Sequence, residues 1–415
     1  MSKSKAQAQA NQSHKVGLEE RVRALGAQLG LTLAAAIEGL NAADEGPLSL
    51  GKRLGLETPL ASRLLRAAAQ ENPFGVLHHS PGPAPLRRFQ RAAARRGSLA
   101  SDKVKGLERA IVQFERLLKD DLGDLTALSQ LLSAWLPEAR AEFELRRKQS
   151  AFRAMSELRG ASAELDLSAC FMHPSANGTH LDVAWAVGSL GLKRLRPGIN
   201  VRFSSQRVTG SDDPERQPSS LDGAPIAEGD RSTLNPFCQR PPGVFRVNQV
   251  GELLQYTLDS EGYGSGSEVD LLFGEFNPAE IEHPLPKGAS RRGWAYSDVA
   301  VPARSLVFDM FLHEDVYPGM DPELLLYDTA IHGIADVNDE SRDADRMDLV
   351  ESLRPLGLSD AELKLKSFKP YPQLVEHVFH QLAWDRRRFR AYRVEIEYPL
   401  YGMQIAMAYS SSTGL

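Results

Sequence analysis

The sequence predicts an α+β protein: a helical N-terminal region, a helical connector, and a larger mixed α+β C-terminal domain with an antiparallel sheet. Through most of the first 160 residues, apolar residues recur at the spacing of an amphipathic helix. Beyond Gly160 the apolar segments become shorter and alternate with polar residues, which is typical of strands. The length of 415 residues is enough for two or three domains.

The composition excludes several classes of protein. Hydrophobic residues make up 42% and charged residues 25%, which is a globular balance rather than a disordered or fibrous one. No apolar run approaches the roughly 18–20 residues of a membrane-spanning helix, so we expect no membrane partner. The N-terminus MSKSKAQAQANQSHK lacks the apolar segment of a secretory signal. With only two cysteines, Cys170 and Cys238, these features predict a soluble cytoplasmic protein.

Charge and pattern divide the chain into four parts. Residues 1–17 are polar and predict a disordered tail. Residues 18–96 predict a helical domain, residues 97–160 a helical connector, and residues 161–415 the α+β domain. Residues 1–160 carry 25 Lys and Arg against 17 Asp and Glu, a net charge of +8, which leaves −13 for the rest of the chain.

Most of the positive charge lies in one window. Residues 52–96 hold nine basic and two acidic residues, a balance of +7 in 45 residues. Such a concentration suits a polyanion. The alternative interpretation is a helix face that is merely solvated.

The same window contains a motif with a recognisable geometry. Residues 46–83 read GPLSLGKRLGLETPLASRLLRAAAQENPFGVLHHSPGP. Leu48–Leu54 predicts a short helix and Gly55 a tight turn. Thr58 is a good N-cap, and Pro59 at the first helical position starts a second helix that runs to Gln70. Two helices joined by a short turn are the arrangement that places a recognition helix in a DNA major groove.

The second helix has two distinct faces. Leu60, Ala61, Leu64, Leu65 and Ala68 form an apolar face, and Ser62, Arg63, Arg66 and Gln70 form a polar one. Phe74–Ser80 is β-prone and is followed by Pro81-Gly82-Pro83, so it predicts a wing of two short strands beside the helix. His78 and His79 would then contact phosphate or the minor groove; the alternative is that they are surface residues without a role.

The run LGLETPLASRLLRA resembles the helix-turn-helix of bacterial winged-helix regulators of the IclR and MarR kind, over about residues 20–90. The resemblance implies a winged helix-turn-helix domain in residues 18–96, with Thr58, Pro59, Ser62, Arg63 and Arg66 on the side that faces DNA. Residues 161–415 resemble no ligand-binding domain that we can name.

We therefore predict a sequence-specific DNA-binding protein, a bacterial transcription regulator whose C-terminal domain responds to a small-molecule or protein effector or forms oligomers. The partner is double-stranded DNA rather than RNA, because the window lacks the clustered aromatics that stack on single strands. The predicted DNA-binding residues are Lys52, Arg53, Thr58, Ser62, Arg63, Arg66, His78, His79, Arg87 and Arg88.

An apolar seam in the connector predicts helix pairing. Its members are Val104, Leu107, Ile111, Phe114 and Leu118, followed in phase by Leu125, Leu128, Leu132 and Trp135. Spacings of three and four residues suit a coiled-coil homodimer, which would present two recognition helices to a palindrome. The alternative is two helices of one chain that fold back at Asp120-Asp121.

The C-terminal domain is less regular. We expect strands at Ile199–Phe203 and Glu268–Phe273, and a closing hairpin of Arg393–Tyr398 with Met403–Tyr409. Residues 204–243 are rich in Ser, Pro, Gly and Asp, and predict disorder or a functional lid or arm. Helices are expected at Leu349–Leu353, Asp360–Leu365 and Gln373–Trp384.

The acidic half offers little evidence of enzyme chemistry, and we predict no catalytic residue, metal or cofactor. His313-Glu314-Asp315 with Asp309, and Glu376 with His377 and His380, contain metal-ligating types, but neither spacing is diagnostic. The alternative function is an enzyme, metal-dependent or not, in residues 161–415, with an N-terminal module that binds nucleic acid or a partner. A further alternative is an adaptor whose helix-turn-helix binds protein. The run Arg386–Arg388 with Arg390 and Arg393 predicts internal or intersubunit salt bridges.

Overall fold

The computed structural model describes residues 2–96, 99–207, 217–227, 229–251, 253–283 and 291–409, with side chains from residue 17 onward. The chain divides into two units, which we call the helical unit (residues 1–144) and the mixed unit (residues 145–415). A helical region followed by a larger sheet region agrees with the predicted fold class. None of the described helices combines the length and the apolar character that crossing a bilayer requires.

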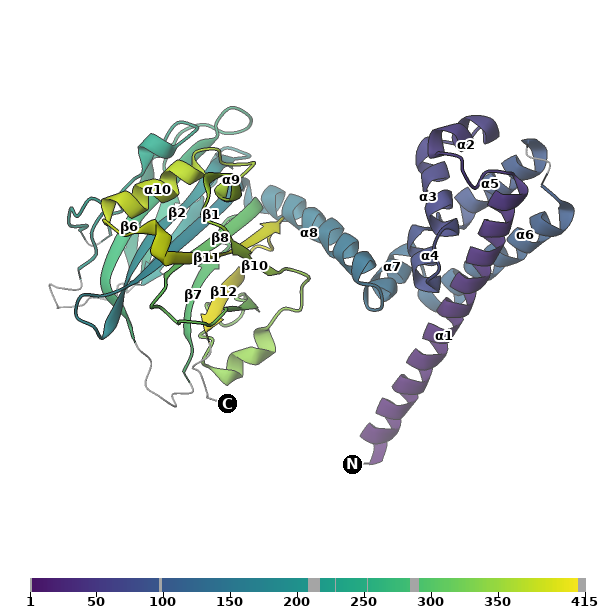
Figure 1. The fold of residues 1–415 in the computed structure, drawn as a ribbon, viewed down its shortest axis with the longest axis horizontal. Coiled ribbons are helices and arrows are strands. Elements are labelled where there is room, and N and C mark those ends of the chain that lie inside the picture. The colour runs from purple at the N-terminus through teal and green to yellow at the C-terminus, as the bar shows by residue number, and fades with distance from the viewer. Residues whose placement is uncertain are drawn as a thin grey trace. The chain divides into compact units, whose positions relative to one another are not determined.

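The described elements of the helical unit are all helices (Figure 1). They are α1 (Ser2–Gly39), α2 (Pro47–Leu54), α3 (Thr58–Ala68), α4 (Pro73–His79), α5 (Pro83–Arg96), α6 (Ser101–Arg116), the π-helical segment Leu117–Leu122, α7 (Leu125–Ser133) and α8 (Pro137–Arg159), which continues into the mixed unit. Because α1 begins at Ser2, residues expected to form a disordered tail are helical. Their Ala, Gln and Lys content favours a helix.

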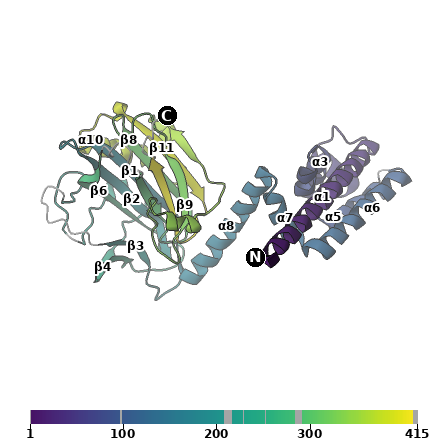
Figure 2. The ribbon, with the colours of Figure 1, turned by 90° about the horizontal axis from the view of Figure 1, so that it is seen from below.

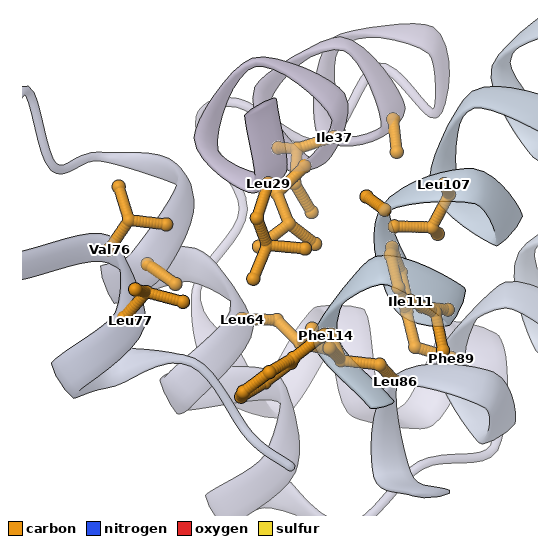
Figure 3. Packing of buried hydrophobic residues seen from close by; sticks show 14 of the residues in the cluster. Leu29, Ile37, Leu64, Val76, Leu77, Leu86, Phe89, Leu107, Ile111 and Phe114 are labelled. Carbon is orange, nitrogen blue, oxygen red and sulfur yellow. The ribbon is translucent and has the colours of Figure 1, made fainter. Parts of the chain in front are cut away.

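The core of the helical unit gathers side chains from each of the helices α1 to α8, and Figure 3 shows part of it. Leu29 of α1 and Leu64 of α3 are fully buried, as are Leu107, Ile111 and Phe114 of α6. The last three belong to the predicted dimer seam. They pack against their own chain, so this part of the seam does not offer a surface for a second copy.

The predicted wing is wrong, because Phe74–Ser80 forms helix α4 and its C-terminal cap rather than two strands. The side-chain oxygen of Asn72 accepts a hydrogen bond of 3.0 Å from the backbone N–H of Phe74, and Pro73 occupies the first turn. Phe74 and Leu77, three residues apart on one helix face, are buried. Cap and burial together outweigh the local β-propensity.

Helices α1 and α4 approach closely at Gly26. A Cβ atom at this position would lie 2.1 Å from the carbonyl oxygen of Pro73. We expect Gly26→Ala to lower the free energy of unfolding of the helical unit by about 1–3 kcal/mol through this overpacking. Gly17→Ala is the matched control in the same helix, because nothing lies within 4 Å of its added Cβ. It should raise stability by up to about 1 kcal/mol. Urea unfolding followed by circular dichroism measures both, and equal effects would contradict the close approach.

The mixed unit is built on a six-stranded sheet with the order β10-β11-β8-β1-β2-β6 (Figure 2). Strands β1 and β8 pair in parallel and their neighbours are antiparallel, so the sheet is mixed. The strands are β1 (Ala161–Pro174), β2 (His180–Arg194), β6 (Val269–Glu282), β8 (Ala303–His313), β10 (Leu353–Leu356) and β11 (Phe389–Glu397). Helices α9 (Asp360–Leu363) and α10 (Tyr371–Gln381) bury apolar residues against one face of this sheet. They correspond to two of the three helices that the sequence predicts in this domain.

Two smaller sheets complete the unit. One has the order β7-β12-β9 and the other β3-β5-β4. Their strands are β3 (Arg202–Arg207), β4 (Phe245–Val250), β5 (Leu253–Leu258), β7 (Gly293–Asp298), β9 (Glu323–Asp328) and β12 (Met403–Tyr409). Short 3-10 turns lie at Asn235–Phe237, Glu340–Asp345 and Arg386–Arg388.

The predicted closing hairpin is wrong, although both of its strands exist. Strand β11 pairs with β8 and β10, and β12 pairs with β7 and β9, so the two strands lie in different sheets. Both are largely buried, which requires hydrogen-bond partners on both edges. A two-stranded hairpin would leave one edge of each strand unpaired.

Two other segments differ from expectation. Leu349–Leu353 is not a helix; it leads into the edge strand β10. Within 204–243, residues 204–207 belong to β3, and 208–216 and 228 lie outside the described residues. The described remainder packs on β6 through bridges Ser219–Phe276 and Thr233–Phe273. It thus covers an edge of the large sheet, with Leu221 and Leu234 buried.

Candidate nucleic-acid interface

The predicted pair of helices is present as α2 and α3, joined by the turn Gly55–Glu57. Gly55 ends α2 in the left-handed conformation with φ +68°, and the N–H of Leu56 donates back to the Gly51 carbonyl at 2.8 Å. Glu57 rather than Thr58 is the N-cap residue of α3, and its side chain makes no capping hydrogen bond. Thr58 is therefore an exposed residue of the first turn, and its predicted capping role is wrong by one position.

A basic hollow lies between this turn and helix α5. Its volume is about 310 Å³. We call it the arginine hollow; it is lined by Leu54, Gly55, Leu56 and Glu57 of the turn and by Arg88, Arg91, Ala92, Arg95 and Arg96 of α5. Spacings of three and four residues place these α5 side chains on one helix face.

The charge of the arginine hollow is largely uncompensated. Arg88 lies 3.6 Å from the carboxylate of Glu57, with both side chains exposed. Arg91, Arg95 and Arg96 are also exposed, and none of them forms an ion pair within the described part of the chain. The N-terminus of α3, which starts beside Glu57, adds a partial positive charge. Four guanidinium groups and one carboxylate thus meet around one cavity.

Of the predicted DNA-binding residues, Lys52, Thr58, Arg66 and Arg88 are exposed, and Ser62 is half-buried on α3. Lys52 and Arg66 form no hydrogen bond or ion pair with another described side chain. These side chains are available to a partner molecule.

Arg63 has a different environment from the predicted one. Its Nε donates to the carbonyl of His79 at 3.3 Å and its Nη2 to the carbonyl of Ser80 at 2.5 Å. A cation beside the last carbonyls of a helix stabilises that helix end. Arg63 therefore holds the C-terminal end of α4 instead of pointing away from the unit, and we leave it out of the proposed interface.

Arg53 and Arg87 also make internal contacts. Arg53 lies 3.0 Å from Glu45 and donates to the Leu40 carbonyl at 2.9 Å. Arg87 pairs with Glu108 at 2.5 Å and with Glu115 at 2.7 Å. These hydrogen bonds lower the pKa of both carboxyl groups below their usual range and raise the pKa of Arg87. Both arginines are thus largely neutralised by their own chain.

His78 and His79 contact helix α8. Their Nε2 atoms lie 3.5 Å from Glu142 and 3.6 Å from Glu138, respectively. The two imidazoles are nearly covered, with 7% and 12% of the side chains exposed. The segment that carries them is a helix and not a wing, so this geometry does not support their predicted contact with phosphate or the minor groove.

Arg91, Arg95 and Arg96 were not among the predicted DNA-binding residues, although all three lie in the basic window. The helical spacing of the sequence could have identified them, because positions 88, 91, 92, 95 and 96 share one face of a helix.

Comparisons with protein-family models, curated proteins and solved structures found no match to this chain. The function is therefore inferred from the side chains and their contacts.

Most of the metal-ligating residue types singled out in the mixed unit have partners in their own chain, although the ligand atoms of His313, Glu314 and Asp315 lie within 4.8 Å of one another. Asp309 is fully buried and accepts hydrogen bonds from Arg393 and Tyr371. Glu314 and Asp315, next to His313, both pair with Arg388. Among the other residues, Glu376 pairs with Arg386 and His377 packs on Phe237. The predicted internal salt bridges are present for Arg386, Arg387, Arg388 and Arg393, whereas Arg390 donates to backbone carbonyl groups instead.

Two carboxyl groups of the mixed unit lie close together, of which Asp166 is half-buried and Asp298 is exposed. Burial raises the pKa of Asp166 to about 8, and the nearby carboxyl group of Asp298 contributes. These residues lie on β1 and β7, in the two sheets that pack together, where Ser168 and Ser297 also share a hydrogen bond of 2.9 Å. Sequence pattern gives no sign of this pair, because a polar position in a strand usually faces solvent.

Proposed function

We propose that the helical unit binds double-stranded DNA through the arginine hollow, with help from Lys52 and Arg66, and that the chain is a cytoplasmic, sequence-specific transcription regulator. The observation that carries this proposal is the row of Arg91, Arg95 and Arg96 on one face of α5, exposed and without acidic partners among the described residues. Guanidinium groups match phosphate oxygens in two-pronged hydrogen bonds, and phosphate contacts supply most of the affinity for DNA.

The position of the hollow relative to α3 supports reading of a duplex. Phosphate contacts from α5 and from the turn before α3 would fix the register of the protein on the backbone. Arg66 and Ser62 on α3 are then the side chains to read bases, with arginine suited to guanine O6 and N7. The lining of the hollow has no aromatic ring, which favours a duplex over a stacked single strand.

The mixed unit is suited to regulation rather than to DNA contact. Residues 161–415 carry a net charge of −13, which repels phosphate. A groove of about 650 Å³ lies beside β10 and β11, lined by apolar residues such as Leu356 and Phe389 and by polar ones such as Arg390 and Tyr392. Apolar walls with a few polar groups are typical of small-molecule sites, so this groove is our candidate effector site.

A homodimer completes the proposal. Two copies would present two α3 helices to half-sites one DNA turn apart, roughly 34 Å along the duplex. Sedimentation of the chain with and without duplex DNA tests this part of the proposal. A monomer in both conditions would contradict it.

Arg66 and Lys52 should respond differently to substitution. Arg66→Ala should weaken binding to a cognate site by about 1–3 kcal/mol and relax the preference at one base pair. Lys52→Ala should weaken all duplex sequences alike and reduce the salt slope by about one unit. Arg109→Ala, which removes an exposed charge outside the hollow, is the control. Competition titrations with cognate and scrambled duplexes measure the effects; if both variants match this control, the assignments are wrong.

Sequence specificity is tested by selection. The full chain is incubated with a random duplex pool, and the retained DNA is sequenced over successive rounds. We expect enrichment of a common sequence with two related half-sites. Retention of DNA without any enrichment would show a nonspecific binder and contradict the regulator.

A further inference from the structure

Two histidines and two glutamates of the helical unit converge at the point where α4 ends and α8 begins. His78 and His79 are the last residues of α4, and their ring centroids lie 4.8 Å apart. Glu138 and Glu142 are four residues apart on α8, and therefore share one face of that helix. The Nε2 of His78 lies 3.5 Å from a carboxylate oxygen of Glu142, and the Nε2 of His79 lies 3.6 Å from one of Glu138.

The positions of the two imidazoles are fixed by the packing and hydrogen bonds of the segment that carries them. Phe74 of α4 packs on Trp135, with ring centroids 4.9 Å apart, two residues before α8 begins. Arg63 donates to the carbonyl groups of His79 and Ser80 and so fixes the backbone that carries the histidines. Both histidine side chains are about nine-tenths buried, whereas Glu138 and Glu142 are more than half exposed. The site is thus partly preformed: the histidine side is fixed by packing, and the glutamate side is exposed.

We propose that His78, His79, Glu138 and Glu142 form a structural site for a divalent transition-metal ion, with Zn²⁺ as the best match. Imidazole nitrogen and carboxylate oxygen are the ligands that Zn²⁺ takes in proteins, and four protein ligands are typical of its structural sites. The bound ion would join the last turn of α4 to the first turns of α8 within the helical unit.

The distances agree with tetrahedral coordination. Bonds of about 2.0–2.1 Å from Zn²⁺ to nitrogen and oxygen place neighbouring ligand atoms about 3.3 Å apart. The two observed nitrogen–oxygen separations, 3.5 and 3.6 Å, are close to this edge length. The ligand atoms of His78, His79 and Glu138 all lie within 4.8 Å of one another. Glu142 lies outside this group of three but is 3.5 Å from His78, so it would complete the set by a rotation of its half-exposed side chain.

The local electrostatics favour a cation. The negative charge comes from the two carboxylates of Glu138 and Glu142 on α8, because the last carbonyl groups of α4 already accept hydrogen bonds from Arg63. Without a metal ion, the same residues would form two ion pairs only when the histidines are protonated. A zinc ion instead binds neutral imidazoles, and its charge balances both carboxylates. This inference is independent of DNA binding.

The test is a zinc titration of the full chain after treatment with a chelator. Isothermal titration calorimetry with zinc chloride should show one equivalent bound, and thermal unfolding of the helical unit should shift to higher temperature on binding. Co²⁺ in place of Zn²⁺ should give the absorption bands of a tetrahedral site. His79→Ala should weaken zinc binding at least about tenfold. Glu138→Gln with Glu142→Gln should do the same, and both of these side chains are more than half exposed.

The matched control is His332→Ala. His332 is an exposed histidine of the mixed unit that lies 3.1 Å from a single carboxylate, that of Asp345. This variant should bind zinc like the wild type. The proposal is overturned if the wild type binds no zinc, if the glutamine double variant binds it unchanged, or if His332→Ala removes the binding.

Discussion

Replacing Asp309 with alanine is expected to lower the free energy of unfolding of the mixed unit by about 3–5 kcal/mol. Asp309 on β8 and Arg393 on β11 are both inaccessible to solvent. Arg393 donates its Nε to one carboxylate oxygen at 2.7 Å and its Nη2 to the other at 2.6 Å. The hydroxyl group of Tyr371 on α10 donates to the second oxygen at 2.5 Å. Loss of the carboxylate would leave a buried guanidinium without its counter-ion.

A matched control separates this effect from the loss of any acidic residue. Asp315 lies at the end of the same strand and also pairs with an arginine, Arg388 at 3.2 Å, but that pair is exposed. Asp315→Ala should therefore cost less than about 1 kcal/mol. Urea unfolding, followed by a probe that reports the transition of the mixed unit, measures both variants. Equal losses would show that Asp309 is not held as the structure places it.

The second large effect is expected on DNA binding. The triple variant Arg91→Ala, Arg95→Ala, Arg96→Ala should bind random duplex DNA about 100-fold more weakly than the wild type in 0.1 M salt. The slope of log affinity against log salt should become shallower by about 2.7, which is about 0.9 for each phosphate that the variant no longer neutralises. All three side chains are exposed, so stability should change little.

The control for this variant removes the same charge from another surface. Arg109, Arg116 and Lys119 are exposed residues of α6 and of the π-helical segment after it, and they do not line the arginine hollow. Their triple alanine variant should keep its affinity within a few-fold, because net charge alone acts weakly at this salt concentration. Equal losses in the two triple variants would assign binding to overall charge rather than to α5.

Local patterns in the sequence were sufficient to predict the helical motif. Gly55 ends one helix and Pro59 lies in the first turn of the next, and both signals depend only on neighbouring residues. The face of α3 was also predictable, because Leu60 and Leu64 are buried and Arg66 is exposed, as a helical period requires. The positive charge of the helical unit follows from composition alone.

Most of the features that the sequence did not predict depend on contacts between residues far apart in the chain. Arg63 and Arg87 read as surface cations, but their partners lie 16 to 28 residues away in sequence and no local pattern marks them. The alternating pattern of the sequence predicts strands β11 and β12. Their pairing partners depend on how the three sheets assemble, which the local pattern does not show. In the predicted wing, the cap formed by Asn72 outweighs the β-propensity of the residues after it, so the segment is a helix.

The central claim, that the helical unit binds the DNA backbone through arginines, is tested most directly by titrating random duplex DNA with the full chain at two salt concentrations. Fluorescence anisotropy of a labelled duplex reports the bound fraction. We expect saturable binding at low salt that weakens with added salt, with a log–log slope steeper than about −3. Absence of binding at low salt, or binding that salt does not change, would contradict the claim.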